Sequence, residues 1–109
     1  MTANAAKVWF DGKLLNEDKV KVSILSYGLH YGWGVYEGLR VYDTPRGREV
    51  FRLRDHMVRF LNSAKVLRLD IPYSVDQLCL AVKTVCRANG PGPTISALWP
   101  STARTATCH

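Results

Sequence analysis

The residue types best suited to chemistry gather in one glycine-rich stretch, Tyr27–Arg40, which contains four glycines, three tyrosines, a histidine, a tryptophan, a glutamate and an arginine. If the chain is extended from Gly34 onwards, alternate side chains share a face, so that Tyr36, Gly38 and Arg40 lie together. The opposite face then carries Val35, Glu37 and Leu39. A ring, a gap and a guanidinium on one face suit a flat anionic ligand lying against a sheet. A glycine-rich turn that leads into an aromatic strand has the same composition, so the pattern alone leaves both interpretations open.

Arg59 is a second candidate for binding an anion. Together with His56 and Ser63 it lies on one stripe of a predicted helix, away from the apolar face. A planar guanidinium in this place could bind a phosphate with two parallel hydrogen bonds. The alternative is that Arg59 is an ordinary solvated arginine on a helix surface.

Length and composition describe one ordinary globular domain. The chain has 109 residues, of which 47% are hydrophobic and 22% are charged, and this excludes a chain that is disordered as a whole. We expect a cytoplasmic protein without a membrane partner, because the sequence has neither a signal-peptide pattern nor an apolar run near the ~20 residues that span a bilayer.

Of the three cysteines, Cys79 and Cys86 fall in a helical pattern and are expected to be reduced and partly buried. The spacing typical of metal ligands is missing, so no metal is predicted.

The charge balance favours a small anionic ligand over nucleic acid. Fifteen Lys and Arg against nine Asp and Glu give a net charge of +6, but the basic residues are spread along the chain instead of gathered with aromatic ones. We therefore expect no nucleic-acid partner. A basic surface facing a small anion, or a missing acidic partner domain, accounts for the excess.

Period-two patterns and turn signals predict antiparallel hairpins in the first half of the chain. Asp11-Gly12 and residues 43–47, with Pro45 and Gly47, are expected to form the turns. Residues 20–24 alternate between apolar and polar and indicate a strand or an extended arm. The other strands expected are Lys7–Phe10, Lys13–Leu15, Leu39–Tyr42 as the continuation of the glycine-rich stretch, and Glu49–Leu53.

The second half of the chain has the period of helices. Apolar spacing predicts an amphipathic helix over Arg54–Leu69, which Pro72 stops. Ser74 and Gln77 have the form of a capping box for a second helix, which Asn89-Gly90 ends. Antiparallel hairpins followed by two helices predict an α+β fold.

Five motifs carry a resemblance to a known family: Trp9–Gly12, Leu29–Gly32, Val35–Arg40, Phe51–His56 with Arg59, and Asn62–Lys65. Through them, the segment Val8–Gly90 resembles the N-terminal small domain of the branched-chain amino acid aminotransferases, which are class IV pyridoxal-phosphate enzymes. The resemblance implies the small-domain fold of that class over residues 1–90.

The resemblance also implies roles for single residues. Arg59 would bind the phosphate of pyridoxal 5'-phosphate, and Tyr36 and Gly38 would line the substrate pocket beside the cofactor. Arg40 would belong to the same polar wall, and Tyr31 would reach the active site of the partner subunit in a homodimer or a higher homo-oligomer. The small-molecule partners would be branched-chain amino acids and 2-oxo acids.

Two residues depart from the family's pattern. Trp33 stands where a small or medium residue is usual, and Tyr36 replaces the commoner phenylalanine. A phenol in an otherwise apolar pocket would shift the preference among substrate side chains, so the sequence leaves the ranking of substrates open.

The resemblance ends after Gly90, and residues 91–109 show no helical or strand period, so we expect an unstructured tail. Family members continue there with Tyr-Ile-Arg-Pro on a strand. Codons chosen for Thr94–Leu98 (ACT-ATA-TCC-GCC-CTN) give Tyr-Ile-Arg-Pro when they are read from the third base. We therefore predict that the tail is an out-of-frame translation, which also removes the strand arginine that would help to hold the substrate.

The family's chemistry needs a lysine that forms a Schiff base with the cofactor and an acid on the pyridine nitrogen. The resemblance places both in a second, larger domain, and neither Lys65 nor Lys83 matches a catalytic position. We therefore expect no catalytic residue in this chain and no activity from it alone. The full-length enzyme would transfer the amino group between leucine, isoleucine or valine and 2-oxoglutarate. The alternatives are a D-amino-acid transaminase or aminodeoxychorismate lyase of the same fold, and a non-catalytic fragment that only associates with other subunits.

Overall fold

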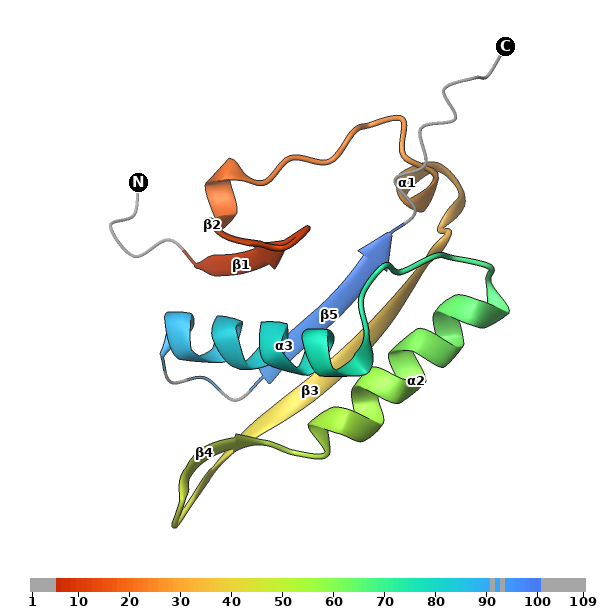
Figure 1. The fold of residues 1–109 in the computed structure, drawn as a ribbon. Coiled ribbons are helices and arrows are strands. Elements are labelled where there is room, and N and C mark those ends of the chain that lie inside the picture. The colour runs from red at the N-terminus through yellow and green to blue at the C-terminus, as the bar shows by residue number, and fades with distance from the viewer. Residues whose placement is uncertain (1–5, 91, 93, 101–109) are drawn as a thin grey trace.

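In the computed structural model, which describes residues 6–90, 92 and 94–100, the chain folds into two small antiparallel sheets and two long helices (Figure 1). This architecture confirms the predicted α+β class. The elements are β1 (Lys7–Phe10), β2 (Lys13–Asn16), the 3-10 turn η1 (Glu17–Lys19), α1 (Tyr27–Tyr31), β3 (Gly34–Thr44), β4 (Gly47–Val50), α2 (Leu53–Val66), α3 (Val75–Asn89) and β5 (Thr94–Pro100).

The β1–β2 hairpin forms at the predicted turn. Asp11 has φ 51° and Gly12 has φ 88°, and positive φ at both central residues is what a tight hairpin turn of this kind requires. The hairpin is tied to the end of α3, because the Asn89 side chain accepts a hydrogen bond from Lys7 N at 2.7 Å and donates one to Lys7 O at 2.8 Å. The first and last parts of the predicted small domain are thereby joined.

β3 is the central strand of the larger sheet, whose order is β4-β3-β5. Its residues alternate between buried and exposed along most of its length. The buried ones include Val35, Glu37, Leu39 and Val41. α2 packs on this buried face of β3, α3 packs against α2 and β5, and the β1–β2 hairpin packs against α3 (Figure 1). The two faces predicted for residues 35–40 are therefore confirmed.

One strand prediction is wrong, and for another segment the structure decides between two alternatives. The return strand predicted over Glu49–Leu53 covers Gly47–Val50 instead, because Arg52 takes a left-handed conformation with φ 51° and Leu53 already begins α2. Residues 20–24, for which a strand or an extended arm was expected, form a connecting segment and not a strand, in keeping with the second alternative. Alternation alone does not make a strand, since the backbone groups also need a neighbouring strand to bond.

The expectation of an unstructured tail is also wrong in part, because Thr94–Pro100 form β5. β5 runs antiparallel to β3, with Ser96 as the register partner of Gly38. Trp99 packs against the core. The edge of β3 supplies hydrogen bonds that hold these residues extended although their own sequence has no strand period. Residues 101–109 lie outside the described part of the chain, and the out-of-frame origin of the tail stays a prediction.

α2 and α3 lie where the apolar spacing predicted helices. α3 begins with the expected capping box: Ser74 Oγ accepts from Gln77 N at 3.1 Å, and Gln77 Oε1 accepts from Ser74 N at 2.8 Å. α2 ends at Val66 and not at Leu69, because Arg68 takes a left-handed conformation with φ 57° and Leu69 turns into the core.

One apolar core joins β3 to the two helices. Leu39 and Met57 are each 1% exposed, and Phe60 is 2% exposed. The buried cluster consists of Val35, Leu39, Met57, Phe60, Ala64, Leu69, Leu78 and Val82. In the part of the chain that the structure describes, no helix is long and apolar enough to cross a bilayer.

The cysteine prediction is confirmed for the two residues that the structure describes. Cys79 and Cys86 are free thiols on α3, and both are partly buried. Burial raises the pKa of the Cys79 thiol. Among the described residues, no group of three His, Cys, Asp or Glu side chains could hold a metal ion.

Candidate functional site

The uncovered face of β3 carries three of the residues selected from the sequence. Tyr36, Gly38 and Arg40 alternate along this face, and Tyr36 is 62% exposed. The Tyr36 ring lies beside Gly38, since a methyl group built on Gly38 would be 3.5 Å from the Tyr36 hydroxyl oxygen. The face therefore presents a phenol, a bare patch of main chain and a guanidinium to any ligand that lies against the sheet.

Arg59 lies on the other side of β3, on α2, where two hydrogen bonds join it to Glu37. Arg59 Nε donates to Glu37 Oε2 at 2.7 Å, and Arg59 Nη2 donates to Oε1 at 2.8 Å. The same Oε1 lies 2.8 Å from Nδ1 of His56. The Glu37 side chain is 4% exposed whereas that of Arg59 is 67% exposed, so the pair joins a buried carboxylate to an open guanidinium.

These contacts set the charge of the pair. The hydrogen bond from Arg59 lowers the pKa of Glu37 against the opposing effect of burial, and the contact with His56 lowers it further. The same pairing raises the pKa of Arg59. Glu37 is therefore ionised at neutral pH and fixes one edge of the guanidinium plane. The Nη1 group of Arg59 takes no part in these two bonds to Glu37, so it remains for another acceptor.

Glu37 is the residue that the sequence analysis missed. Its signal was present, because alternation placed an acid on the same face as Val35 and Leu39. A carboxylate among buried apolar side chains needs a cation as a partner. The stripe that contains Arg59 supplies that cation once α2 packs on β3.

The structure does not bring all the predicted site residues together. Arg59 projects from α2 on the covered side of β3, whereas Tyr36 and its neighbours lie on the uncovered side. Beside Arg59 is a hollow of about 200 Å³ lined by Arg52, Asp55, His56 and Arg59. Arg52 is itself paired with Asp55 at 2.8 Å. The hollow thus gathers more basic than acidic groups and suits an anion.

Tyr31 and Trp33 flank Gly32 at the end of α1. Tyr31 is 76% exposed, and its ring packs edge-on against Tyr27 with the ring centroids 5.2 Å apart. Other exposed apolar residues of the same segment are Ile24, Leu25 and Leu29. Trp33 instead packs against the core and donates from Nε1 to Leu67 O at 2.9 Å. Trp33 therefore anchors the start of β3 to the end of α2.

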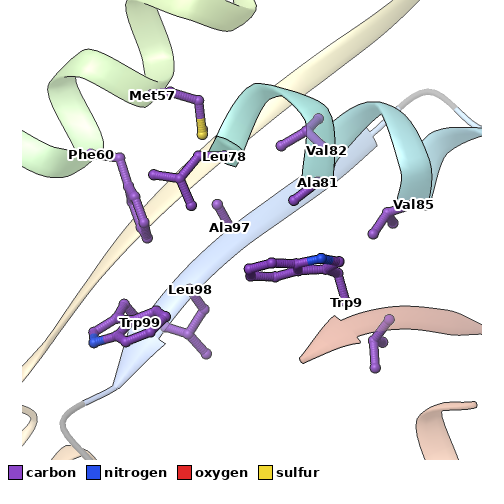
Figure 2. Close-up of a pocket in the computed structure, with 11 residues that line it drawn as sticks. Trp9, Met57, Phe60, Leu78, Ala81, Val82, Val85, Ala97, Leu98 and Trp99 are labelled. Carbon is purple, nitrogen blue, oxygen red and sulfur yellow. The ribbon is translucent and has the colours of Figure 1, made fainter. Parts of the chain in front are cut away.

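An apolar cavity of about 160 Å³ lies between β1, α3 and β5 (Figure 2). Trp9 of β1 and Trp99 of β5 both line it, together with Leu78 and Ala81 of α3. The site residues predicted from the sequence lie elsewhere. Because an apolar lining gives a charged substrate no group to bind, we assign this cavity to core packing.

The model of the amino-transferase class IV family matches residues 34–106 of this chain. The match continues beyond Gly90, so the resemblance extends further than the sequence analysis placed it. The chain is also similar to the branched-chain-amino-acid aminotransferases of Salmonella typhimurium and Escherichia coli, each 42% identical over 88 residues. Those residues make up 81% of this chain and 28% of either relative.

The solved structures that resemble this chain include branched-chain aminotransferases as well. A branched-chain amino acid aminotransferase from T.th., complexed with N-(5'-phosphopyridoxyl)-L-glutamate, is 42% identical with a TM-score of 0.85 over 91% of this chain and 34% of that one. The branched-chain aminotransferase of the archaeon Thermoproteus uzoniensis with norvaline is 47% identical with a TM-score of 0.78, over 86% and 32% of the two chains. The chain thus spans about a third of the length of the proteins it resembles.

Proposed function

Because the chain belongs to the amino-transferase class IV family, we propose that it is the N-terminal part of a branched-chain amino acid aminotransferase. The observation that carries this proposal is the match, at a TM-score of 0.85 and 42% identity, to a branched-chain enzyme complexed with a phosphopyridoxyl compound. The whole enzyme transfers the amino group between leucine, isoleucine or valine and 2-oxoglutarate. The D-amino-acid transaminase and lyase alternatives find less support, since the relatives named above are branched-chain aminotransferases.

Pyridoxal 5'-phosphate is the proposed cofactor, and the surroundings of Arg59 fit its phosphate group. When bound, this cofactor supplies an electron sink for the carbon that carries the amino group. Arg59 binds the phosphate through the edge of the guanidinium that Glu37 leaves open. Glu37 is a positioning residue in this proposal, because it acts through Arg59. His56 steadies the Glu37 carboxylate from the preceding turn of α2.

The uncovered face of β3 is the proposed substrate wall. Tyr36 and Arg40 stand on either side of Gly38, where the bare main chain lets a substrate side chain approach closely. The solvent-exposed side chain of Tyr31 supports a role at the active site of a partner subunit in a homodimer or larger assembly.

We expect the chain by itself to catalyse nothing. Lys65 lies in the last turn of α2, and Lys83 lines a groove between β4 and α3. Neither place belongs to the proposed substrate wall on β3. A fragment that only associates with other subunits is the second candidate, for which the exposed side chain of Tyr31 offers a contact.

Borohydride trapping tests this expectation. The purified chain is incubated with pyridoxal 5'-phosphate, reduced and digested, and its labelled peptides are identified by mass spectrometry. We expect no lysine labelled stoichiometrically and no glutamate formed from leucine and 2-oxoglutarate. The full-length Escherichia coli relative serves as the positive control. Stoichiometric labelling of one lysine together with turnover of leucine would contradict the proposal.

A chimera tests the substrate class. Residues 1–90 replace the matching segment of the Escherichia coli relative, so that the proposed cofactor arginine and substrate wall come from this chain. We expect transamination of leucine, isoleucine and valine. Turnover of D-alanine in place of these substrates would favour the D-amino-acid transaminase alternative.

A further inference from the structure

A second groove lies between β4, the first turn of α2 and the outer side of α3. Its volume is about 850 Å³, within the range of small-molecule sites, and it shares no lining residue with the hollow beside Arg59. Four cationic side chains line it, namely Arg48, Arg54, Lys83 and Arg87. Leu53 and Leu80 contribute apolar surface to the same groove. The groove therefore offers both charge and apolar contact to one ligand.

The acidic residues of the groove balance only part of this charge. Asp76 is paired with Arg54 at 2.6 Å, which cancels one cation. Glu49 forms its ion pair with Arg46, which is not among the residues that line the groove, and also accepts from Thr44 Oγ1 at 2.7 Å. Three cationic side chains are left without a carboxylate partner among the described residues.

Arg48 is held across one end of the groove. Its Nη2 group donates to Cys86 Sγ at 3.4 Å and to Gly92 O at 3.5 Å. These are long contacts to weak or neutral acceptors, so the guanidinium reaches from β4 to α3 without being neutralised. A guanidinium placed in this way is already oriented for an anionic ligand.

Lys83 and Arg87 are four residues apart on α3, and both are exposed. Side chains at this spacing are neighbours on a helix, and two like charges there disfavour the helix. A bound anion would remove that repulsion and gain hydrogen bonds from both side chains. The repulsion between Lys83 and Arg87 therefore disfavours the empty site, and a bound anion relieves it.

We propose that this groove binds a small phosphate-bearing molecule with at least two negative charges, through Arg48, Lys83 and Arg87. Three cations from two elements match such a ligand, and the apolar surface of Leu53 and Leu80 contacts its organic part. The site is separate from the proposed cofactor site, and it stands or falls independently of the aminotransferase activity.

Titration calorimetry with inorganic pyrophosphate tests the proposal on the 109-residue chain at pH 7 and low salt. We expect saturable binding, weakened at least about tenfold in the double variant Lys83→Gln, Arg87→Gln, because two charge-assisted contacts are lost. Glutamine keeps the helix propensity of both positions, and circular dichroism verifies the fold. The matched control Lys13→Gln, Lys21→Gln removes the same charge from exposed positions outside the groove and should change the affinity less than about twofold.

Three outcomes would overturn the proposal. The first is the absence of saturable binding. The second is an equal loss in the control variant, which would make the effect one of net charge. The third is an equal loss in Arg59→Ala, which would place pyrophosphate in the hollow beside α2.

Discussion

Two arginine–carboxylate pairs on α2 differ in a way that separates a candidate site from an ordinary surface contact. Arg59 and Arg54 are each 67% exposed, and both make hydrogen bonds shorter than 3 Å to a carboxylate. The difference lies in the partner. Glu37 is 4% exposed and is bound through two nitrogens of Arg59, whereas Asp76 is 80% exposed and is bound through one nitrogen of Arg54.

The partner's burial decides what each pair does. A buried carboxylate cannot rearrange towards water, so it holds Arg59 in one orientation and needs Arg59 to remain charged. An exposed carboxylate exchanges freely with solvent, and such pairs contribute little to stability. Arg59 and Arg54 are therefore equally exposed, but the orientation of Arg59 depends on its carboxylate partner far more than that of Arg54 does.

The largest expected effect is on cofactor binding in the chimera. Arg59→Ala should weaken the affinity for pyridoxal 5'-phosphate at least about tenfold, because a charge-assisted arginine–phosphate contact is lost. Arg59→Lys should recover only part of this loss, since an ammonium lacks the planar fork. Arg54→Ala removes the same charge from the same helix and should bind the cofactor like the parent. Equal affinities of the two alanine variants in a dialysis titration would remove Arg59 from the cofactor site.

The next effect is on stability. Glu37→Gln keeps the side-chain volume but replaces charge-assisted hydrogen bonds with weaker ones and turns an amide towards Arg59. We expect the free energy of unfolding in urea to fall by about 2 kcal/mol. Asp76→Asn should cause no measurable loss, and raising the salt concentration should not change the Glu37→Gln result much. A similar loss in both variants would show that burial does not distinguish the pairs.

The smallest effect is a pH dependence of that stability difference. The pKa of Glu37 in the folded chain lies below its ordinary value of 4.5, so the pair contributes stability above that value and loses it as the pH falls through the lowered pKa. The gap in urea midpoint between the parent and Glu37→Gln should be complete at pH 7 and should narrow below 4.5. Glu49→Gln is the control. The pKa of Glu49 is also lowered, chiefly by its hydrogen bond with Thr44, but Glu49 is more exposed than Glu37. Its gap in urea midpoint should therefore be smaller than that of Glu37→Gln. If the difference in urea midpoint between the parent and Glu37→Gln stays constant down to the pH at which the chain unfolds, the lowered pKa of Glu37 is contradicted.

Local patterns predicted the elements whose signals are complete within a few residues. Asp11-Gly12 formed the hairpin turn, and Ser74 with Gln77 formed the capping box, because each depends on backbone groups of its own segment. The short helix α1 was not predicted, since the glycines around it indicated a turn. The helix predicted over Arg54–Leu69 is Leu53–Val66 in the structure, because left-handed residues next to each end, Arg52 and Arg68, set the boundaries.

The sequence by itself determined which residues share each face of β3, because side chains alternate along any extended strand. It therefore placed Tyr36, Gly38 and Arg40 together and grouped Glu37 with the core. Only the tertiary structure decided that Arg59 meets Glu37, 22 residues away, since that contact depends on how α2 packs across the sheet. It also decided that β5 is a strand, because residues without a strand period become extended when the edge of β3 offers them hydrogen bonds.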